Sequence, residues 1–189
     1  MTIIAAYEEG NKYWIASDSV GSDGSMKYEY GNKLISRGDY IIAFSWSYRV
    51  ADIIKECKGF PQKLSGLKEL RIIRDIIKNA ILDDGLIGDD GNVSRRSTAS
   101  GHPFYLVIIS PSGIYTIEND YQIHKISTGY AAAGSGQEVA TGSLYTSKKL
   151  KINGKKAIQL AVKAASELTL FCGGKCHVKS VEKKNASKK

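Results

Sequence analysis

The chain of 189 residues lacks most features that would mark a secreted or membrane protein. It has three cysteines, an odd number that gives no disulfide framework and fits a reducing compartment. No apolar run approaches the roughly 20 residues that cross a bilayer. A signal peptide needs a continuous apolar segment, and the charged residues Glu8, Glu9 and Lys12 interrupt the apolar start of this chain. We therefore expect a cytoplasmic protein that begins with mature sequence and has no membrane partner.

Metal-ligating residues are also scarce. Cys172 and Cys176 in CGGKCH supply two thiolates, and His177 supplies one imidazole, without a second cluster elsewhere. A structural zinc site normally has four such ligands. We therefore expect no metal and no cofactor, and ordinary packing for these thiols.

Positive charge exceeds negative charge, with 27 Lys and Arg against 19 Asp and Glu and a formal net charge of +8. This balance permits a nucleic-acid-binding hypothesis, which predicts salt-sensitive binding. Part of the excess, however, lies in a polar basic tail over 183–189, and the other basic residues are scattered among carboxylates. Because no aromatic and basic binding motif accompanies them, a solvated surface is the better interpretation.

Hydrophobic residues make up 42% of the chain, which suits a single domain with a core, placed at 1–182. Apolar, β-branched and aromatic runs predict strands at 3–7, 13–17, 40–47, 104–110, 113–120, 122–127, 127–133 and 175–182. Two weaker strands are expected within 21–39. Helical spacing predicts helices at 49–58, at 66–82, after 136 and at 153–171. In the second of these, the expected apolar face consists of Leu67, Leu70, Ile73, Ile77 and Leu82.

The order of these elements is strands, two helices, strands, two helices and a strand. Such clustering favours an α+β domain over alternating βαβ units. Two antiparallel sheets packed together, with a helix pair on each outer face, satisfy the order and form a four-layer αββα sandwich. The polar segment 83–103, rich in Gly, Asp and Ser, is expected to be an exposed loop.

Thr2 at the start of the first strand has unusual chemical potential. An N-terminal threonine carries a nucleophilic Oγ and a free α-amino group that accepts its proton. The pKa of an α-amino group is about 7.7–8.0, so part of it is neutral near neutral pH. This chemistry requires loss of Met1, which is expected because a small side chain follows it.

Three further features would support this chemistry. Lys33 would lower the pKa of the amine and of the hydroxyl, and Asp18 would balance its charge. Backbone N–H groups in the turn at Gly134 and Gly136 would stabilise an oxyanion. Each feature also has a structural explanation: Asp18 as a turn cap, Lys33 as a solvated strand residue, and the glycine turn as a helix start.

The order of the segments is more specific than any one of them. TIIAAY, WIASDS, GNKLIS, IIAFSWSYRVADII and GYAAAGSGQEVATGSL, in this order, resemble the proteasome β-subunit superfamily of N-terminal nucleophile hydrolases. The chain looks similar to HslV-like and Anbu-like bacterial or phage homologues from Thr2 to about Glu182. The resemblance implies the four-layer fold, with Thr2 as nucleophile and base, Asp18 and Lys33 as a charge pair, and Ser135 as an orienting hydroxyl.

The resemblance also implies a substrate-binding strand. The N–H of Ala43 would bind the oxyanion, and Ser45, Trp46 and Val50 would line the specificity pocket. Relatives often have Asp and Ser near the amine, where this chain has Thr169 and Cys172. This departure weakens the expected support of the site.

The leading hypothesis is a threonine endopeptidase that cleaves peptides or unfolded proteins. The resemblance further implies a homo-oligomer, as a ring or a helical assembly, and allows an ATP-dependent unfoldase as a partner. The alternative is a catalytically inactive scaffold or binding subunit that retains Met1, because acylation of the amine removes the base.

Overall fold

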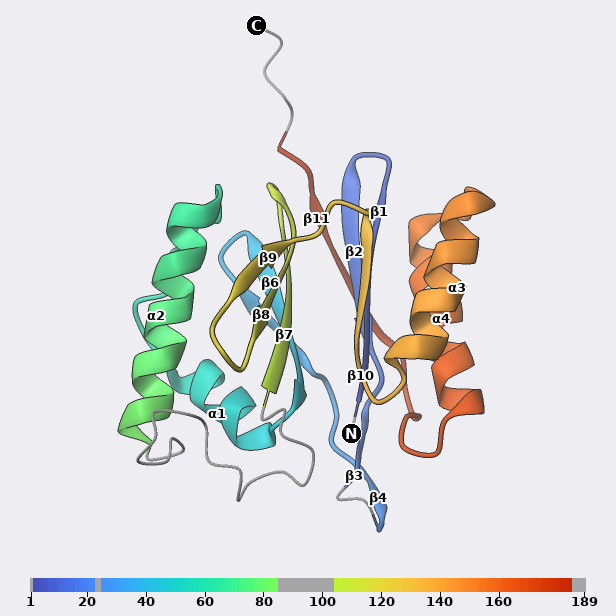
Figure 1. Cartoon of the computed structure of the whole chain (residues 1–189), viewed down its shortest axis with the longest axis horizontal. Helices are drawn as coiled ribbons and strands as arrows, with labels where there is room; N and C mark the ends of the chain where they lie inside the picture. Colours follow the sequence, from blue (N-terminus) through green and yellow to red (C-terminus); the bar gives the residue numbers. More distant parts are fainter. Residues whose placement is uncertain (1, 23–24, 85–103, 185–189) are drawn as a thin grey trace, which may run out of the picture.

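The computed structural model describes residues 2–22, 25–84 and 104–184, apart from the side chain of Trp46. Two antiparallel sheets lie face to face, with helices on both outer faces (Figure 1). The predicted α+β architecture of four layers is confirmed. The expected loop over 83–103 lies outside the described residues from position 85 onward.

The four-stranded sheet has the order β10-β1-β2-β11. Its strands are β10 (Tyr130–Gly134), β1 (Ile3–Glu9), β2 (Lys12–Ser17) and β11 (His177–Glu182). The register pairs Ile3 with Gly134, and Ile4 with Ser17. The first residues of β1 therefore lie between the end of β10 and the end of β2, which brings Thr2 close to Gly134 and Asp18.

The five-stranded sheet has the order β5-β6-β7-β8-β9. Its strands are β5 (Leu34–Arg37), β6 (Tyr40–Trp46), β7 (Phe104–Ser110), β8 (Gly113–Glu118) and β9 (Ile123–Lys125). A separate hairpin of β3 (Val20–Ser22) and β4 (Lys27–Glu29) extends from the end of the sandwich at which the chain starts (Figure 1).

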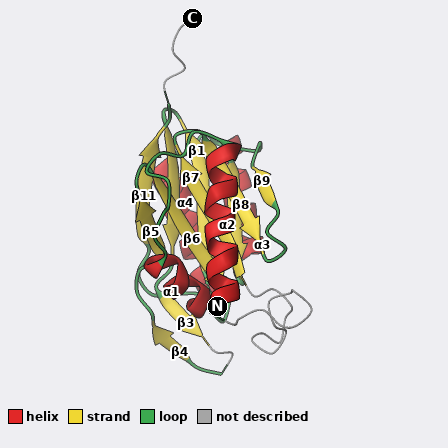
Figure 2. Cartoon of the chain, turned by 90° about the vertical axis from the view of Figure 1, so that its left-hand side faces the viewer, coloured by secondary structure: helices red, strands yellow, loops and turns green. Residues whose placement is uncertain are grey.

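Two helices cover each sheet. α1 (Tyr48–Glu56) and α2 (Leu67–Asp83) lie on the five-stranded sheet, and α2 runs across its face (Figure 2). α3 (Gln137–Lys149) and α4 (Gly154–Leu168) cover the four-stranded sheet. In α2 the inward residue near the end is Ile81, not Leu82, because Ile81 follows Ile77 by four positions. The expected inward position of Leu67 is also corrected, because this first residue of α2 is 51% exposed.

Apolar side chains fill three layers: one under each helix pair and one between the sheets. The layer between the sheets includes Ile4, Ile15 and Val107. Beyond β11, the N–H groups of Lys183 and Lys184, which the sequence assigned to a tail, still donate to backbone carbonyls at 2.9 Å. None of the described helices is long and apolar enough to span a bilayer.

Candidate active site

Thr2, Asp18 and Lys33 meet where β1 begins, β2 ends and β5 begins. Nζ of Lys33 lies 2.6 Å from Oγ1 of Thr2 and 2.6 Å from Oδ1 of Asp18. It also donates to the carbonyl oxygen of Val20 at 2.6 Å. The residues Thr2, Asp18 and Lys33 are 0–1% exposed. One buried ammonium therefore uses its three hydrogens to join a hydroxyl, a carboxylate and a backbone carbonyl.

The Asp18 carboxylate receives two further hydrogen bonds. The N–H of Ile3 donates to Oδ1, and the N–H of Gly173 donates to Oδ2, each at 3.1 Å. Burial lowers the pKa of Lys33 below its ordinary 10.5, and the nearby Asp18 opposes this shift. Desolvation of a buried ion pair is costly unless additional hydrogen bonds accompany it, and here they do.

Gly134 allows the backbone of Thr2 to lie close to β10. Its φ is +99°, in the region that favours glycine, and an added Cβ would lie 2.1 Å from the carbonyl oxygen of Thr2. The turn is therefore needed for close packing around Thr2.

We expect Gly134→Ala to lower the free energy of unfolding by at least about 1–2 kcal/mol, from its backbone conformation alone, and the backbone clash adds to this. Gly142→Ala is the matched control, because Gly142 lies within α3 with no atom within 4 Å of its added Cβ. The control should raise stability by about 0.5–1 kcal/mol. Urea unfolding measures both variants. Wild-type stability of Gly134→Ala would contradict the close approach.

Ser135 and Cys172 lie beside the same backbone. Oγ of Ser135 donates to the carbonyl oxygen of Thr2 at 3.4 Å, and it lies 3.5 Å from Sγ of the buried Cys172. Gly136 caps α3, where an added Cβ would lie 3.1 Å from Sγ of Cys172. Ser135 therefore contacts the main-chain carbonyl of Thr2 and not the Thr2 hydroxyl, and Cys172 contacts Ser135.

Thr169 is placed elsewhere. Its Oγ1 donates to the carbonyl of Ala165 at 2.7 Å, at the C-terminal end of α4. The same carbonyl also accepts the backbone N–H of Thr169 at 3.0 Å, so the hydroxyl adds a second hydrogen bond at the helix end. The expected support of the amine by Thr169 therefore has no counterpart in the hydrogen bonds of the described residues.

Ala43, whose N–H was expected to bind the oxyanion, lies within β6 between two neighbouring strands. It pairs with Leu34 of β5 on one side and with Val107 of β7 on the other, and it is fully buried between the sheets. Because strands flank it on both sides, its N–H takes part in the sheet. The expected oxyanion donor is therefore corrected: this N–H is not available to a substrate.

The predicted pocket residues are also largely packed inside. Ser45 is fully buried, and its Oγ donates to the carbonyl of Tyr105 at 3.3 Å. Val50 is fully buried in the layer under α1 and α2. The side chain of Trp46 lies outside the described part of the structure. Neither Ser45 nor Val50 forms an exposed pocket wall.

Sequence reasoning missed Tyr48, the first residue of α1. Burial raises the pKa of its phenol, and the Thr2 side chain opposes this shift. The sequence contains no motif that distinguishes this tyrosine from the neighbouring aromatic residues. Its place directly after the predicted strand was the available signal.

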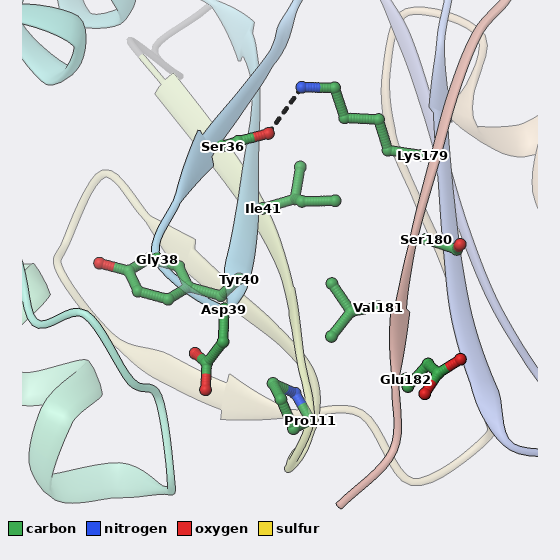
Figure 3. Close-up of a pocket in the computed structure, with 10 residues that line it drawn as sticks. All are labelled: Ser36, Gly38, Asp39, Tyr40, Ile41, Pro111, Lys179, Ser180, Val181 and Glu182. Carbon is green, nitrogen blue, oxygen red and sulfur yellow. Dashed lines mark hydrogen bonds between the residues drawn. The ribbon is translucent and has the colours of Figure 1, made fainter.

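A cavity of about 540 Å³ lies away from this cluster, between β5 and β11, the edge strands of the two sheets (Figure 3). Lys179 of β11 donates to Oγ of Ser36 in β5 at 2.6 Å across it. Its lining residues are Ser36, Gly38, Asp39, Tyr40, Ile41, Pro111, Lys179, Ser180, Val181 and Glu182. None of Thr2, Asp18 and Lys33 lines this cavity, so it is not the substrate-binding space of the candidate active site.

Metal ligands do not gather in groups of three or more His, Cys, Asp or Glu within 2–22, 25–84 and 104–184.

Solved structures with this arrangement of layers are numerous. The chain matches BPH of Thiobacillus denitrificans, a bacterial proteasome homologue, with a TM-score of 0.81 and 20% identity over 97% of this chain and 100% of BPH. It matches HslV from Trypanosoma brucei with a TM-score of 0.69 and 17% identity, over 96% of this chain and 99% of HslV. This is the proteasome-like fold of the N-terminal nucleophile hydrolases.

A third proteasome-like structure agrees. A Gly-1 mutant of Anbu from Hyphomicrobium sp. strain MC1 matches with a TM-score of 0.68 and 12% identity, over 96% of this chain and 82% of that one. No protein-family model and no curated protein matches the sequence. At these identities the likeness establishes the proteasome-like fold and not the activity.

Proposed function

We propose that this protein is a threonine-type N-terminal nucleophile hydrolase that cleaves peptide bonds. The observation that supports it is the position of the Lys33 ammonium, 2.6 Å from both Oγ1 of Thr2 and Oδ1 of Asp18 in a fully buried site. Buried charged groups with specific partners are common at functional sites, and a lysine and an aspartate beside the hydroxyl of residue 2 suit its activation as a nucleophile.

The proposed reaction begins when cleavage before Thr2 frees its α-amino group. The amine accepts the hydroxyl proton while Oγ1 attacks the substrate carbonyl and the carbonyl π pair moves to oxygen. The tetrahedral intermediate then expels the leaving amine, which takes a proton from the α-ammonium group of Thr2. An ester on Thr2 remains, and water hydrolyses it by the same steps.

Lys33 acts as a cation in this scheme rather than as the base. Its three hydrogens already donate to Thr2, Asp18 and Val20, so the charged group has no lone pair for a proton. Its charge lowers the pKa of the hydroxyl and of the α-amine, because it favours their less positive forms. Asp18 holds the ammonium in this place.

The proposal extends to the surroundings of the reaction. We propose a cytoplasmic homo-oligomer, as a ring or a helical assembly, that degrades peptides or unfolded proteins, with an ATP-dependent unfoldase as a partner. Structures of the same fold named HslV and BPH support this choice. Enclosure also suits the chemistry, because an exposed protease would damage its own cell. Nucleic acid is not a proposed partner.

Intact mass and covalent labelling test the proposal together. We expect a mass that lacks the initiator methionine, and an adduct on Thr2 after treatment with a peptide epoxyketone. Such a warhead needs the hydroxyl and the free amine of one residue, and BPH has been solved in complex with epoxomicin. The matched control is the same peptide ketone without the epoxide, which should leave the mass unchanged. A retained Met1 without adduct would instead favour the inactive scaffold.

A further inference from the structure

The cavity between β5 and β11 lies between two free sheet edges. Among the described strands, β5 pairs only with β6, and β11 pairs only with β2. An edge strand presents unpaired backbone N–H and C=O groups on its outer side. This cavity of about 540 Å³ therefore has a row of such groups on each of two sides (Figure 3).

Contacts just beyond β11 show which of its backbone groups face the cavity. The N–H of Lys183 donates to the turn between β1 and β2, whereas the N–H of Lys184 donates across to the carbonyl of Pro111, each at 2.9 Å. Backbone groups alternate in direction along an antiparallel strand, so those of Ser180 and Glu182 point to the same side as those of Lys184. This is the cavity side, because Pro111, Ser180 and Glu182 all line the cavity.

The same reasoning places the free groups of β5. The N–H of Leu34 donates to Oδ1 of Asn32 at 2.9 Å, and the carbonyl of Leu34 accepts from Nζ of Lys179 at 3.4 Å. Both groups therefore point away from β6, and alternation gives those of Ser36 the same direction. The contact between Lys179 and Oγ of Ser36 lies at one end of the cavity (Figure 3).

The spacing of the two edges suits one extended chain. Sheets packed face to face lie about 10 Å apart, and hydrogen-bonded strands lie about 4.7–4.9 Å apart. A chain seated midway between the edges is therefore about one strand spacing from each. Ile41 and Val181 point toward each other across the cavity, and both belong to the apolar layer between the sheets (Figure 3). They would contact an apolar side chain of the seated chain.

A carboxylate lies at the other end of the cavity, away from Lys179 and Ser36. It belongs to Asp39, whose Oδ1 accepts the N–H of Leu64 at 2.8 Å. Within 2–22, 25–84 and 104–184 this is the one hydrogen bond of that carboxylate, so Oδ2 is left for another donor. Lys179, the cation that lines the cavity, already donates to β5. A positively charged side chain therefore suits the Asp39 end.

We propose that this cavity binds an extended, basic peptide segment of a partner protein. Its main chain pairs with β11 and β5, as in other cases of strand addition to a free sheet edge. An apolar side chain lies on Ile41 and Val181, and a lysine or arginine lies near Asp39. This inference goes beyond the proposed hydrolysis, because the cavity is separate from Thr2.

Fluorescence anisotropy with a labelled peptide of alternating lysine and valine tests the proposal. The protein is the full chain with Thr2→Ala, so that the probe is not hydrolysed. We expect saturable binding. The matched control peptide carries N-methyl groups on its backbone nitrogens, which removes the main-chain donors and keeps the side chains and their charge. Equal binding of the two peptides would overturn strand pairing.

A second peptide separates local from general electrostatics. The chain carries a formal net charge of +8, so general attraction favours an acidic peptide. We expect the reverse order, with the lysine and valine probe bound more tightly than a peptide of alternating glutamate and valine. Tighter binding of the acidic peptide would contradict the role of Asp39.

Asp39→Asn tests this carboxylate directly, because it removes the charge and keeps an oxygen for the N–H of Leu64. We expect the affinity for the basic probe to fall about two- to fivefold, as for a partly exposed ion pair. The matched control is Asp120→Asn between β8 and β9, where Oδ1 likewise accepts a backbone N–H, from Gln122 at 2.9 Å. That control should bind as before, and thermal unfolding should show that both variants fold. Unchanged affinity of Asp39→Asn would overturn the proposed binding mode.

Hydrogen exchange locates the pairing. The N–H groups of Ser180 and Glu182 should exchange more slowly when the probe is bound. Those of β9, the other edge of the five-stranded sheet, should be unaffected. Binding of the probe without protection in β11 would overturn strand addition to this edge.

Two other occupants are distinguishable outcomes. Tighter probe binding after deletion of residues 185–189 would show that the chain's own basic end competes for the cavity. Loss of a homo-oligomer in light scattering on Asp39→Asn would show that a second copy occupies it. Either result overturns a separate partner peptide. An inactive wild type would overturn the proposed hydrolysis and leave these binding results unaffected, because they are measured with Thr2→Ala.

Discussion

Replacement of Thr2 by alanine is expected to reduce peptide hydrolysis by at least about 10⁴-fold, as loss of a nucleophile does in hydrolases that depend on one. Alanine is also small, so the initiator should still be removed and the α-amine retained. The variant therefore removes the hydroxyl that accepts a hydrogen bond from Nζ of Lys33, and it leaves the α-amine that serves as the base. Steady-state kinetics with a fluorogenic peptide measures the loss, and circular dichroism checks the fold.

Two controls accompany this variant. Thr2→Ser keeps a hydroxyl at the same distance from the backbone and should retain measurable turnover. Thr141→Ala removes an exposed threonine from α3, far along the chain from β1, and should leave the rate unchanged. Hydrolysis by Thr2→Ala at the original rate would show that Thr2 is not the nucleophile.

Lys33→Met is the second variant with a large expected effect. It removes the ammonium and leaves the Asp18 carboxylate buried with only the N–H groups of Ile3 and Gly173. Loss of one partner from a buried ion pair typically costs about 3–5 kcal/mol. We expect a loss of this size in the free energy of unfolding, together with loss of activity, measured by urea unfolding and by peptide turnover.

Matched variants separate charge from chemistry. Asp18→Asn combined with Lys33→Met removes both charges, so it should recover part of the stability without recovering turnover. Lys163→Met breaks an exposed pair with Glu167 at 3.7 Å, and it should change stability by less than about 1 kcal/mol. Equal losses from the buried and the exposed lysine would contradict the importance of the buried pair.

The lowered pKa of Lys33 gives the comparison with Lys33→Met a pH dependence. Between this pKa and the ordinary 10.5, the unfolded state binds more protons at this residue than the folded state. The contribution of Lys33 to stability therefore rises as pH increases through this window, and the variant lacks that rise. Turnover should change in the opposite direction, because the ammonium that polarises the Thr2 hydroxyl loses its proton below pH 10.5.

Much of the fold was predictable because strand and helix signals are local. The continuous apolar run in 104–110 and the 3.6-residue spacing of Leu70, Ile73 and Ile77 depend on near neighbours in sequence. The exceptions are Leu67 at the start of α2, which is 51% exposed, and Leu82, which is 44% exposed because the apolar face continues through Ile81. Where several adjacent residues at a helix end are apolar, the sequence does not determine which of them faces the core.

The candidate site was only partly predictable. The order of segments in the chain suggested that Thr2, Asp18 and Lys33 belong together, and the structure places them in hydrogen-bond contact. The expected support from Thr169 has no such counterpart, because that hydroxyl is used at the end of α4. A side-chain type and its position in the chain do not reveal which local acceptor it will take.

The sequence by itself determined the strands, the helices, their layered order and a threonine at residue 2 with a lysine and an aspartate that suit it. Only the tertiary structure decided how the donors predicted around that threonine are used. Ala43 is flanked by strands on both sides, which uses its N–H, and the Thr169 hydroxyl donates to a carbonyl at the end of α4. The reason is physical: local patterns depend on neighbours along the chain, whereas the availability of a donor depends on strands and helices from distant segments.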